Sequence, residues 1–173
     1  MKLCSVLTGL PASGKSTLAE IAATGKEYYT YSTDAYIQAV ADKLGKTHDE
    51  VFPDIIKTAV EVCEMGLQRA IADGKDVIWD QTNLGAKKRK NIVTRMKSAG
   101  YNVSSICFLA PETEQEIEDH NFRLGNRPGK NIPANIMNQM RGSFVLPTLE
   151  EGFEVITFFN IYGDIVSRST DEE

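Results

Sequence analysis

The chain lacks the features that mark membrane and secreted proteins. No apolar run among its 173 residues approaches the roughly 20 residues that cross a bilayer. Met1 and Lys2 lead directly into an apolar segment, which leaves no room for a signal peptide. We therefore expect a cytoplasmic protein that makes no contact with a membrane.

The chain is also poor in the residues that build disulfides and metal clusters. Its three cysteines, Cys4, Cys63 and Cys107, are far apart and odd in number, so we expect buried free thiols. Its two histidines, His48 in a polar loop and His120 in a polar helix, form no cluster. We assign neither histidine a catalytic role.

An excess of positive charge is missing as well. The net charge of −5 argues against a protein that coats nucleic acid through a broad basic face, but not against one that grips a single strand end. One basic block, residues 87–90 with Arg95 and Lys97, is either a solvated helix face or a guide for such a strand.

No internal repeat, linker or low-complexity segment divides the chain. Its length suits one domain with a sizeable core, which we place at residues 1–168. The polar and acidic tail at 169–173 is expected to fray.

Apolar, β-rich segments alternate with helix-like segments along the chain, which predicts an α/β fold with a parallel sheet covered by helices on both faces. The five expected strands are 2–8, 28–32, 76–79, 102–109 and 154–159. The expected helices are 15–25, 33–44, 49–73, 85–99, 112–125 and 133–143. Tyr28, Tyr29 and Tyr31 of the second strand fit sheet packing better than a platform for stacked bases.

The most specific motif lies between the first strand and the first helix. Residues 9–16 fit the phosphate-loop pattern G-x-x-x-x-G-K-[ST] at every fixed position. Backbone amides at such a helix start bind phosphate, and glycines let the backbone curl around it. We expect a nucleotide to bind the residues that form this loop, which are Gly9, Pro11, Ala12, Ser13, Gly14, Lys15, Ser16 and Thr17.

The motif also predicts the roles of two side chains. Lys15 would reach the β- and γ-phosphates, and the Ser16 hydroxyl would ligate Mg²⁺. ATP or another nucleoside triphosphate, together with Mg²⁺, is therefore the expected cofactor pair.

Two carboxylates follow expected strands, at the sheet edge where α/β proteins bind their ligands. Asp34 follows the second strand and either caps the next helix or accepts the proton of an acceptor hydroxyl, or does both. Asp80 ends the third strand and fits an outer-shell Mg²⁺ acid acting through water, a partner in a substrate network, or a helix cap.

The segment 123–133, called the lid segment below, breaks the regular pattern. It holds two glycines, two prolines and three cations, which is typical of a mobile cationic loop between two helices. We interpret it as a lid over the triphosphate, with an ordinary solvated connection as the alternative. Arg123 and Arg127 would converge on the phosphates.

Together these residues resemble the kinase module of the polynucleotide 5′-hydroxyl kinase family of phages and animals, over nearly the whole chain. The resemblance rests on the phosphate loop, Asp34, the Asp-x-Thr-Asn sequence at 80–83 and the lid arginines Arg123 and Arg127. Similarity to the animal members is strongest at residues 121–123, 144–148 and 151–153.

The resemblance implies a three-layer P-loop kinase fold with an Arg-bearing lid. It also implies transfer of the γ-phosphate of ATP to the 5′-hydroxyl of a DNA or RNA end. Asp34 would be the general base, while Lys15, Arg123 and Arg127 would stabilise charge on the transferred group. The acceptor site would be formed by Asp34, Asp80, Thr82 and Asn83. We expect any phosphatase or ligase partner to be a separate chain, in a bacterial or phage-infected cell.

The chain departs from some phage members, which carry arginines where Thr33 and Ile37 stand here and use them to contact the acceptor's 3′-side phosphate. That difference and the acidic net charge favour another hypothesis, a small-molecule or nucleoside kinase of the same superfamily. A third hypothesis is a nucleotide-binding regulatory or toxin-like module that has lost efficient transfer, and the presence of Lys15, Asp34 and the lid arginines argues against it.

Overall fold

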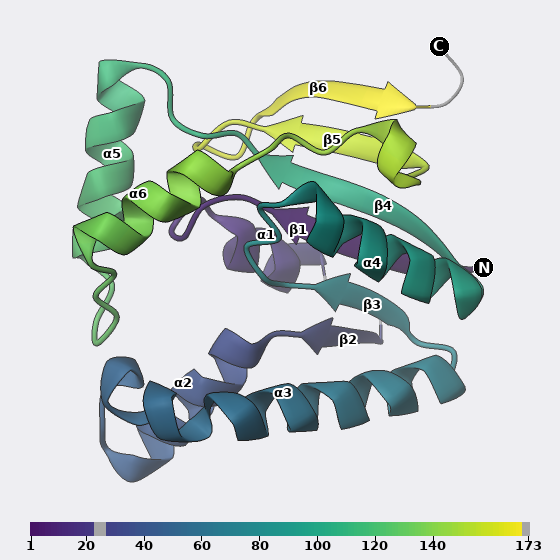
Figure 1. The fold of residues 1–173 in the computed structure, drawn as a ribbon, viewed down its shortest axis with the longest axis horizontal. Coiled ribbons are helices and arrows are strands. Elements are labelled where there is room, and N and C mark those ends of the chain that lie inside the picture. The colour runs from purple at the N-terminus through teal and green to yellow at the C-terminus, as the bar shows by residue number, and fades with distance from the viewer. Residues whose placement is uncertain (23–26, 171–173) are drawn as a thin grey trace.

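One six-stranded sheet forms the centre of this computed structural model, which describes residues 1–22 and 27–170 (Figure 1). The strands are β1 (Lys2–Thr8), β2 (Tyr28–Tyr31), β3 (Asp76–Trp79), β4 (Tyr101–Phe108), β5 (Val155–Phe159) and β6 (Ile165–Thr170). The helices are α1 (Lys15–Ala22), α2 (Thr33–Leu44), α3 (His48–Ala72), α4 (Ala86–Ser98), α5 (Glu114–Gly125) and α6 (Ala134–Ser143), with a 3₁₀ turn at Leu149–Glu151.

The strand order is β2-β3-β1-β4-β5-β6, and all neighbours are parallel except β5 and β6. This confirms the expected α/β class and mostly parallel sheet. The expected strand count was one short, because β6 adds an antiparallel edge. Residues 169–170, which were expected to fray, form the last pairs of β6 with β5. The rest of the expected tail, 171–173, lies outside the described residues, and so do residues 23–25 of the expected first helix.

Two helices cover one face of the sheet and one covers the other (Figure 1). Apolar side chains of α3 and α4 pack with β1, β3 and β4 in the main core cluster. Ala19 of α1 packs on the opposite face against Leu7 and Ile78. Because β1 lies between β3 and β4 and is covered on both sides, its apolar residues run almost continuously rather than alternating. Because β1, β2 and β3 are parallel, the loops that follow them meet at the same edge of the sheet.

The strand tyrosines pack, as the sequence predicted. The Tyr31 ring stacks on Trp79 with centroids 4.2 Å apart, and its hydroxyl donates to Glu64 at 2.9 Å. The Tyr29 hydroxyl donates to the carbonyl of Cys63 at 2.7 Å. All three cysteines are buried free thiols, which is also as predicted.

The basic block at 87–90 is not a continuous solvated face, because Arg89 is fully buried. Its guanidinium binds both oxygens of buried Glu151, at 2.8 and 2.6 Å, and also donates to carbonyl groups of the chain. Those carbonyl acceptors belong to Asn83, Leu84, Val145 and Leu146. Arg89 therefore fastens the turn after β3 to the segment that leads into β5, while its neighbours Lys87, Lys88 and Lys90 stay exposed. No helix in the described part of the chain is long and apolar enough to span a membrane.

We expect Arg89→Met to lower the free energy of unfolding by about 3–5 kcal/mol, because it leaves the carboxylate of Glu151 buried without its partner. Urea denaturation measures the change. Lys90→Met on the exposed side of α4 is the matched control and should stay within about 0.5 kcal/mol of wild type. Equal losses for both variants would contradict the structural role of Arg89.

Candidate active site

The loop between β1 and α1 is a preformed anion site. The Gly9 amide donates to the Thr82 carbonyl at 3.0 Å, and a Cβ at Gly9 would lie 3.0 Å from the Cβ of Phe108. Ala12 has a φ of 61°, a left-handed conformation that side chains disfavour and that clusters at functional sites. α1 begins at Lys15, so the backbone amides of its first turn, which have no partner within the helix, are available to bind an anion in this loop.

Lys15 is buried at the base of this loop and folded back onto it. Its Nζ donates to the Leu10 carbonyl at 2.6 Å and to the Ser13 hydroxyl at 3.3 Å. Burial lowers the pKa of Lys15 to about 8, against the opposing charge of Asp80. A phosphate in the loop would give this ammonium a negatively charged hydrogen-bond partner.

Ser16 and Asp80 are adjacent, as a magnesium site of this kind needs. The Ser16 hydroxyl donates to Oδ2 of Asp80 at 3.0 Å, joining the start of α1 to the end of β3. Burial raises the pKa of Asp80, although the hydrogen bond from Ser16 and the charge of Lys15 oppose the shift. A hydroxyl and a carboxylate beside a phosphate site fit Mg²⁺, a hard cation that prefers oxygen ligands.

The two polar residues after Asp80 differ in placement. Thr82 lines the cleft, whereas Asn83 is fully buried below it. The Asn83 amide donates to the carbonyl of Leu7 at 2.7 Å, and the residue has a φ of 45°. The structure therefore places Asn83 in the framework under the site, where it does not reach the cleft surface.

Asp34 lies in the first turn of α2, and the N-cap role that the sequence left open belongs to Ser32, whose hydroxyl accepts from the Ala35 amide at 3.3 Å. Oδ2 of Asp34 accepts a hydrogen bond from Lys130 and lies 3.9 Å from the Arg127 guanidinium. Oδ1 lies 2.8 Å from Nε2 of His48.

These contacts set the charge state of Asp34. Burial alone would raise the pKa of Asp34, but the hydrogen bond and charge of Lys130 outweigh that effect. The charges of His48 and Arg127 act in the same direction as Lys130. The pKa of Asp34 is therefore lowered, so the carboxylate is ionised at neutral pH and able to accept a proton.

The lid segment reaches across the cleft to the start of α3. The carbonyl of Gly129 accepts from the Asp49 amide at 3.1 Å, and the Asn131 amide donates to the Asp49 carboxylate at 2.7 Å. Arg127 lies on the Asp34 side of this bridge. Arg123 instead lies in the last turn of α5, where it donates to the carbonyl of Ile161 and sits over the ring of Tyr162.

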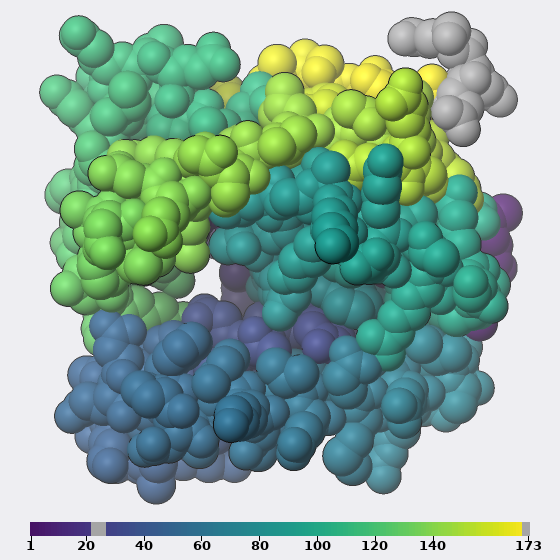
Figure 2. All heavy atoms as spheres, viewed as in Figure 1, coloured from purple at the N-terminus to yellow at the C-terminus, as the bar shows by residue number. Residues whose placement is uncertain are grey.

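One open cleft of about 1730 Å³ gathers most of the expected site residues. Figure 2 shows an opening between the green lid segment, the teal and purple centre of the molecule and the blue helices α2 and α3. The expected residues that line the cleft are Pro11, Ala12, Ser13, Gly14, Lys15, Ser16, Thr17, Asp34, Asp80, Thr82, Arg123 and Arg127. Gly9 is buried behind it.

The basic block contributes one residue to this cleft, Lys88. Position 37 contributes none, because Ile37 is fully buried between α2 and α3. The acceptor contact that some phage enzymes make from that position has no counterpart there.

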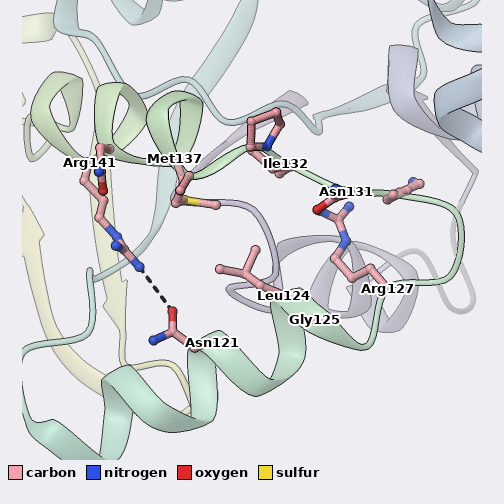
Figure 3. Close-up of a pocket in the computed structure, with 12 residues that line it drawn as sticks. Asn121, Leu124, Gly125, Arg127, Asn131, Ile132, Met137 and Arg141 are labelled. Atoms are coloured by element: carbon pink, nitrogen blue, oxygen red, sulfur yellow. Dashed lines mark hydrogen bonds between the residues drawn. The ribbon is translucent and has the colours of Figure 1, made fainter.

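A second, smaller cavity of about 470 Å³ lies between α5 and α6 (Figure 3). Leu124 and Met137 face each other in it, and the Arg141 guanidinium points at the Asn121 side chain, 3.4 Å away. Arg127 and Lys130 line both this cavity and the cleft. The lid segment therefore separates the two, with the cleft on one side and the smaller cavity on the other.

Sequence reasoning missed two site residues. It placed His48 in a polar loop, but His48 is the buried first residue of α3, beside Asp34. The Thr47–Glu50 capping box is a readable signal for that helix start, although nothing local shows that Asp34 is near. Lys130 was counted only as one cation of the lid segment. His120 is also buried, with Nε2 2.8 Å from the carbonyl of Pro11 in the phosphate loop.

Comparison with known families agrees with this geometry. The model of the family AAA_33, described as an AAA domain, matches residues 5–147. The chain belongs to this family. It is accordingly a nucleotide-binding member of the P-loop kinase superfamily.

Individual relatives are more distant. The chain is 28% identical over 150 residues to a bifunctional polynucleotide phosphatase/kinase of Schizosaccharomyces pombe, a match that covers 86% of this chain and 31% of that protein. It therefore spans about a third of the length of this relative.

Among solved structures, one from the PezAT chromosomal toxin–antitoxin system of Streptococcus pneumoniae has a TM-score of 0.60 at 18% identity and covers 100% of this chain and 72% of that one. A sugar kinase from Janibacter has a TM-score of 0.53 at 17% identity, over 95% and 88% of the two chains. Both comparisons show a shared fold.

We expect Lys130→Met to raise the pKa of Asp34, because it removes the cation that most strongly stabilises the carboxylate. A lowered carboxylate pKa stabilises the fold above the unfolded-state value of about 3.9 and ceases to do so as pH falls through the folded value. The stability difference between wild type and Lys130→Met should therefore be largest at neutral pH and shrink below about pH 4.

Carboxyl ¹³C NMR measures the pKa of Asp34, and urea denaturation at two pH values measures stability. Lys43→Met, an exposed cation at the far end of α2, is the control and should leave the pKa unchanged. A pKa of Asp34 that stayed constant or fell in Lys130→Met would contradict the assigned contact.

Proposed function

We propose that this chain transfers the γ-phosphate of ATP, with Mg²⁺, to the 5′-hydroxyl of a DNA or RNA end. The observation that carries the phosphotransfer is the placement of an ionised carboxylate, Asp34, in the same cleft as Lys15 and Ser16. Phosphoryl transfer needs little more than a phosphate cradle, cations on the transferred oxygens and a group that orients the attacking oxygen. The cleft holds a candidate for each part.

In this proposal the phosphate loop binds the β- and γ-phosphates through backbone amides and Lys15. Ser16 and, through water, Asp80 would hold Mg²⁺, which neutralises charge on the phosphates when bound. Asp34 orients the acceptor hydroxyl and takes its proton as the bond to phosphorus forms.

The lid arginines need different movements to reach the phosphates. Arg127 has to leave the neighbourhood of Asp34, which its position in the lid segment allows. Arg123 sits in the last turn of α5, where it is bound to the carbonyl of Ile161 next to Tyr162, so its side chain has to release these contacts.

Support for a polynucleotide acceptor comes from the relative in Schizosaccharomyces pombe, whose matching region spans most of this chain. Lys88 on the cleft wall is a cation that could contact the strand. A DNA or RNA end is the partner that this proposal expects.

A specific observation favours a second candidate, a kinase for a small neutral acceptor. The cleft wall formed by α2 and α3 carries Asp42 and Asp49 in addition to Asp34, and Ile37 is buried there. Three carboxylates on one wall of the cleft disfavour a bound phosphate diester. The toxin-like alternative has less support, because the parts for transfer are together in one cleft.

The deciding experiment is γ-³²P transfer from ATP and Mg²⁺ to 5′-hydroxyl DNA and RNA oligonucleotides, with free nucleosides and 3′-nucleotides as competing acceptors. We expect labelled oligonucleotides, with an apparent affinity that falls steeply as salt rises, since a polyanion releases counterions on binding. Label on small acceptors alone would select the second candidate.

Asp34→Asn keeps the size of the side chain and removes the base, so we expect transfer to fall by about 10²–10⁴-fold. ATP binding, measured by titration calorimetry, should change less than about twofold, because Asp34 is not part of the phosphate loop. Lys15→Met is the matched comparison and should weaken ATP binding. Loss of ATP affinity in Asp34→Asn with transfer preserved would disprove its role as the base.

A further inference from the structure

His48 is buried, but it lies against the acceptor side of the cleft. It is the first residue of α3, just after the N-cap Thr47, and its side chain is 8% exposed. The Phe52 ring, one turn further along α3, lies near it with ring centroids 5.7 Å apart and ring planes tilted by 37°. Both residues line the same cleft as Asp34.

The imidazole lies between two carboxylates, one from each helix. Nε2 is 2.8 Å from Oδ1 of Asp34, and Nδ1 is 3.5 Å from Oδ1 of Asp49. The contact with Asp34 is close, but its angle is not that of an aligned hydrogen bond. The Asp49 carboxylate is fixed in turn by the Asn131 amide at 2.7 Å, so the ring sits in a rigid surrounding.

The two oxygens of Asp34 have separate partners. The printed contact of His48 is with Oδ1, whereas those of Lys130 and Arg127 are with Oδ2. The Asp34 side chain is 53% exposed, while those of these three partners are 8–27% exposed. Oδ2 is therefore the oxygen on the side of the lid segment, and an acceptor hydroxyl can reach it once Lys130 withdraws.

A general base acts only when one oxygen is held within hydrogen-bonding reach of the hydroxyl it deprotonates. The Asp34 side chain can rotate about χ1 and χ2, and about half of it is exposed. Its position on α2 therefore does not by itself fix the orientation of the carboxylate. A buried partner on Oδ1 limits both rotations, and that partner also contributes, after Lys130, to the lowered pKa of Asp34.

We propose that His48 is a positioning residue for the phosphotransfer, holding Oδ1 of Asp34 so that Oδ2 faces the acceptor hydroxyl. This rests on the proposed phosphotransfer at Asp34 but is independent of whether the acceptor is a polynucleotide or a small molecule. Lys130 takes the place of the acceptor on Oδ2 in the free protein and leaves when the acceptor arrives.

The test is a pair of substitutions that separate the two ring nitrogens. In His48→Gln the amide nitrogen stands where Nε2 was and still reaches Asp34. In His48→Asn the amide nitrogen stands where Nδ1 was, so it keeps the contact to Asp49 and loses the contact to Asp34. Both variants are uncharged and similar in polarity, so thermal melting should show comparable stability.

We expect His48→Asn to lower kcat by about 10- to 100-fold, the size of effect that a misplaced group causes, with the KM for ATP unchanged. His48→Gln should recover at least about half of that loss on a logarithmic scale. If His48→Gln were as slow as His48→Asn, or if both retained wild-type kcat, the positioning role would be overturned. A residue that only packs the start of α3 would lower stability in both variants and leave kcat per folded molecule unchanged.

A readout without turnover tests the same contact. The titratable groups in contact with Asp34 are His48, Lys130 and Arg127, with Asp49 on the other side of the ring, and Lys15 and Asp80 interact with Asp34 from across the cleft. Replacing the imidazole removes one of the contributions that lower the pKa of Asp34, so this pKa should rise in both variants. Carboxyl ¹³C NMR measures the pKa, and an unmoved value would overturn the contact. If wild type transferred phosphate to no hydroxyl acceptor, the proposed function would fail, whereas the NMR titration would still decide whether His48 holds Asp34.

Discussion

The site depends on the clamp that Asn83 forms between two parallel strands. Its buried amide donates to the carbonyl of Leu7 near the end of β1 and, at 3.4 Å, to that of Trp79 at the end of β3. One residue earlier, the Thr82 carbonyl accepts the amide of Gly9. These bonds hold the phosphate loop against the turn that carries Asp80 and so bring the Ser16 hydroxyl within hydrogen-bonding distance of the Asp80 carboxylate. The backbone of Asn83 is in the left-handed conformation, and the same hydrogen bonds offset the cost of that conformation.

The acceptor side of the cleft is built differently, from long-range contacts rather than strand ends. The lid segment is bound to the first turn of α3 through the backbone amide and the side-chain carboxylate of Asp49, and its cations contact Asp34. In the free protein the carboxylate that we propose as the base is therefore already in contact with an ammonium. A hydroxyl that displaces it must provide comparable interactions, which links acceptor binding to movement of the lid segment.

The sequence predicted most of the fold, because the phosphate loop is specific and the apolar periodicity of the first five strands is strong. β6 escaped notice since its central residues, Ser167 and Arg168, present no apolar face and the strand pairs only with β5. In the site, the phosphate loop and the two strand-end carboxylates followed from motif and topology. Their proposed catalytic roles remain predictions.

What sequence reasoning could not supply were contacts between distant segments. His48 meets a carboxylate on the preceding helix, and Lys130 meets the same group from a position 96 residues away. Arg89 is the clearest case, since a run of four cations looks like a surface and only the packing shows that one of them is buried with Glu151.

The buried ammonium of Lys15 has a consequence for the energetics of nucleotide binding. Because its pKa is about 8 in the free protein, a growing fraction of molecules carries a neutral amine as the solution becomes alkaline. A triphosphate stabilises only the charged form, so binding above that pH takes up a proton from solvent. Nucleotide affinity then weakens with rising pH. This linkage between proton uptake and nucleotide binding originates in the desolvation of the Lys15 side chain.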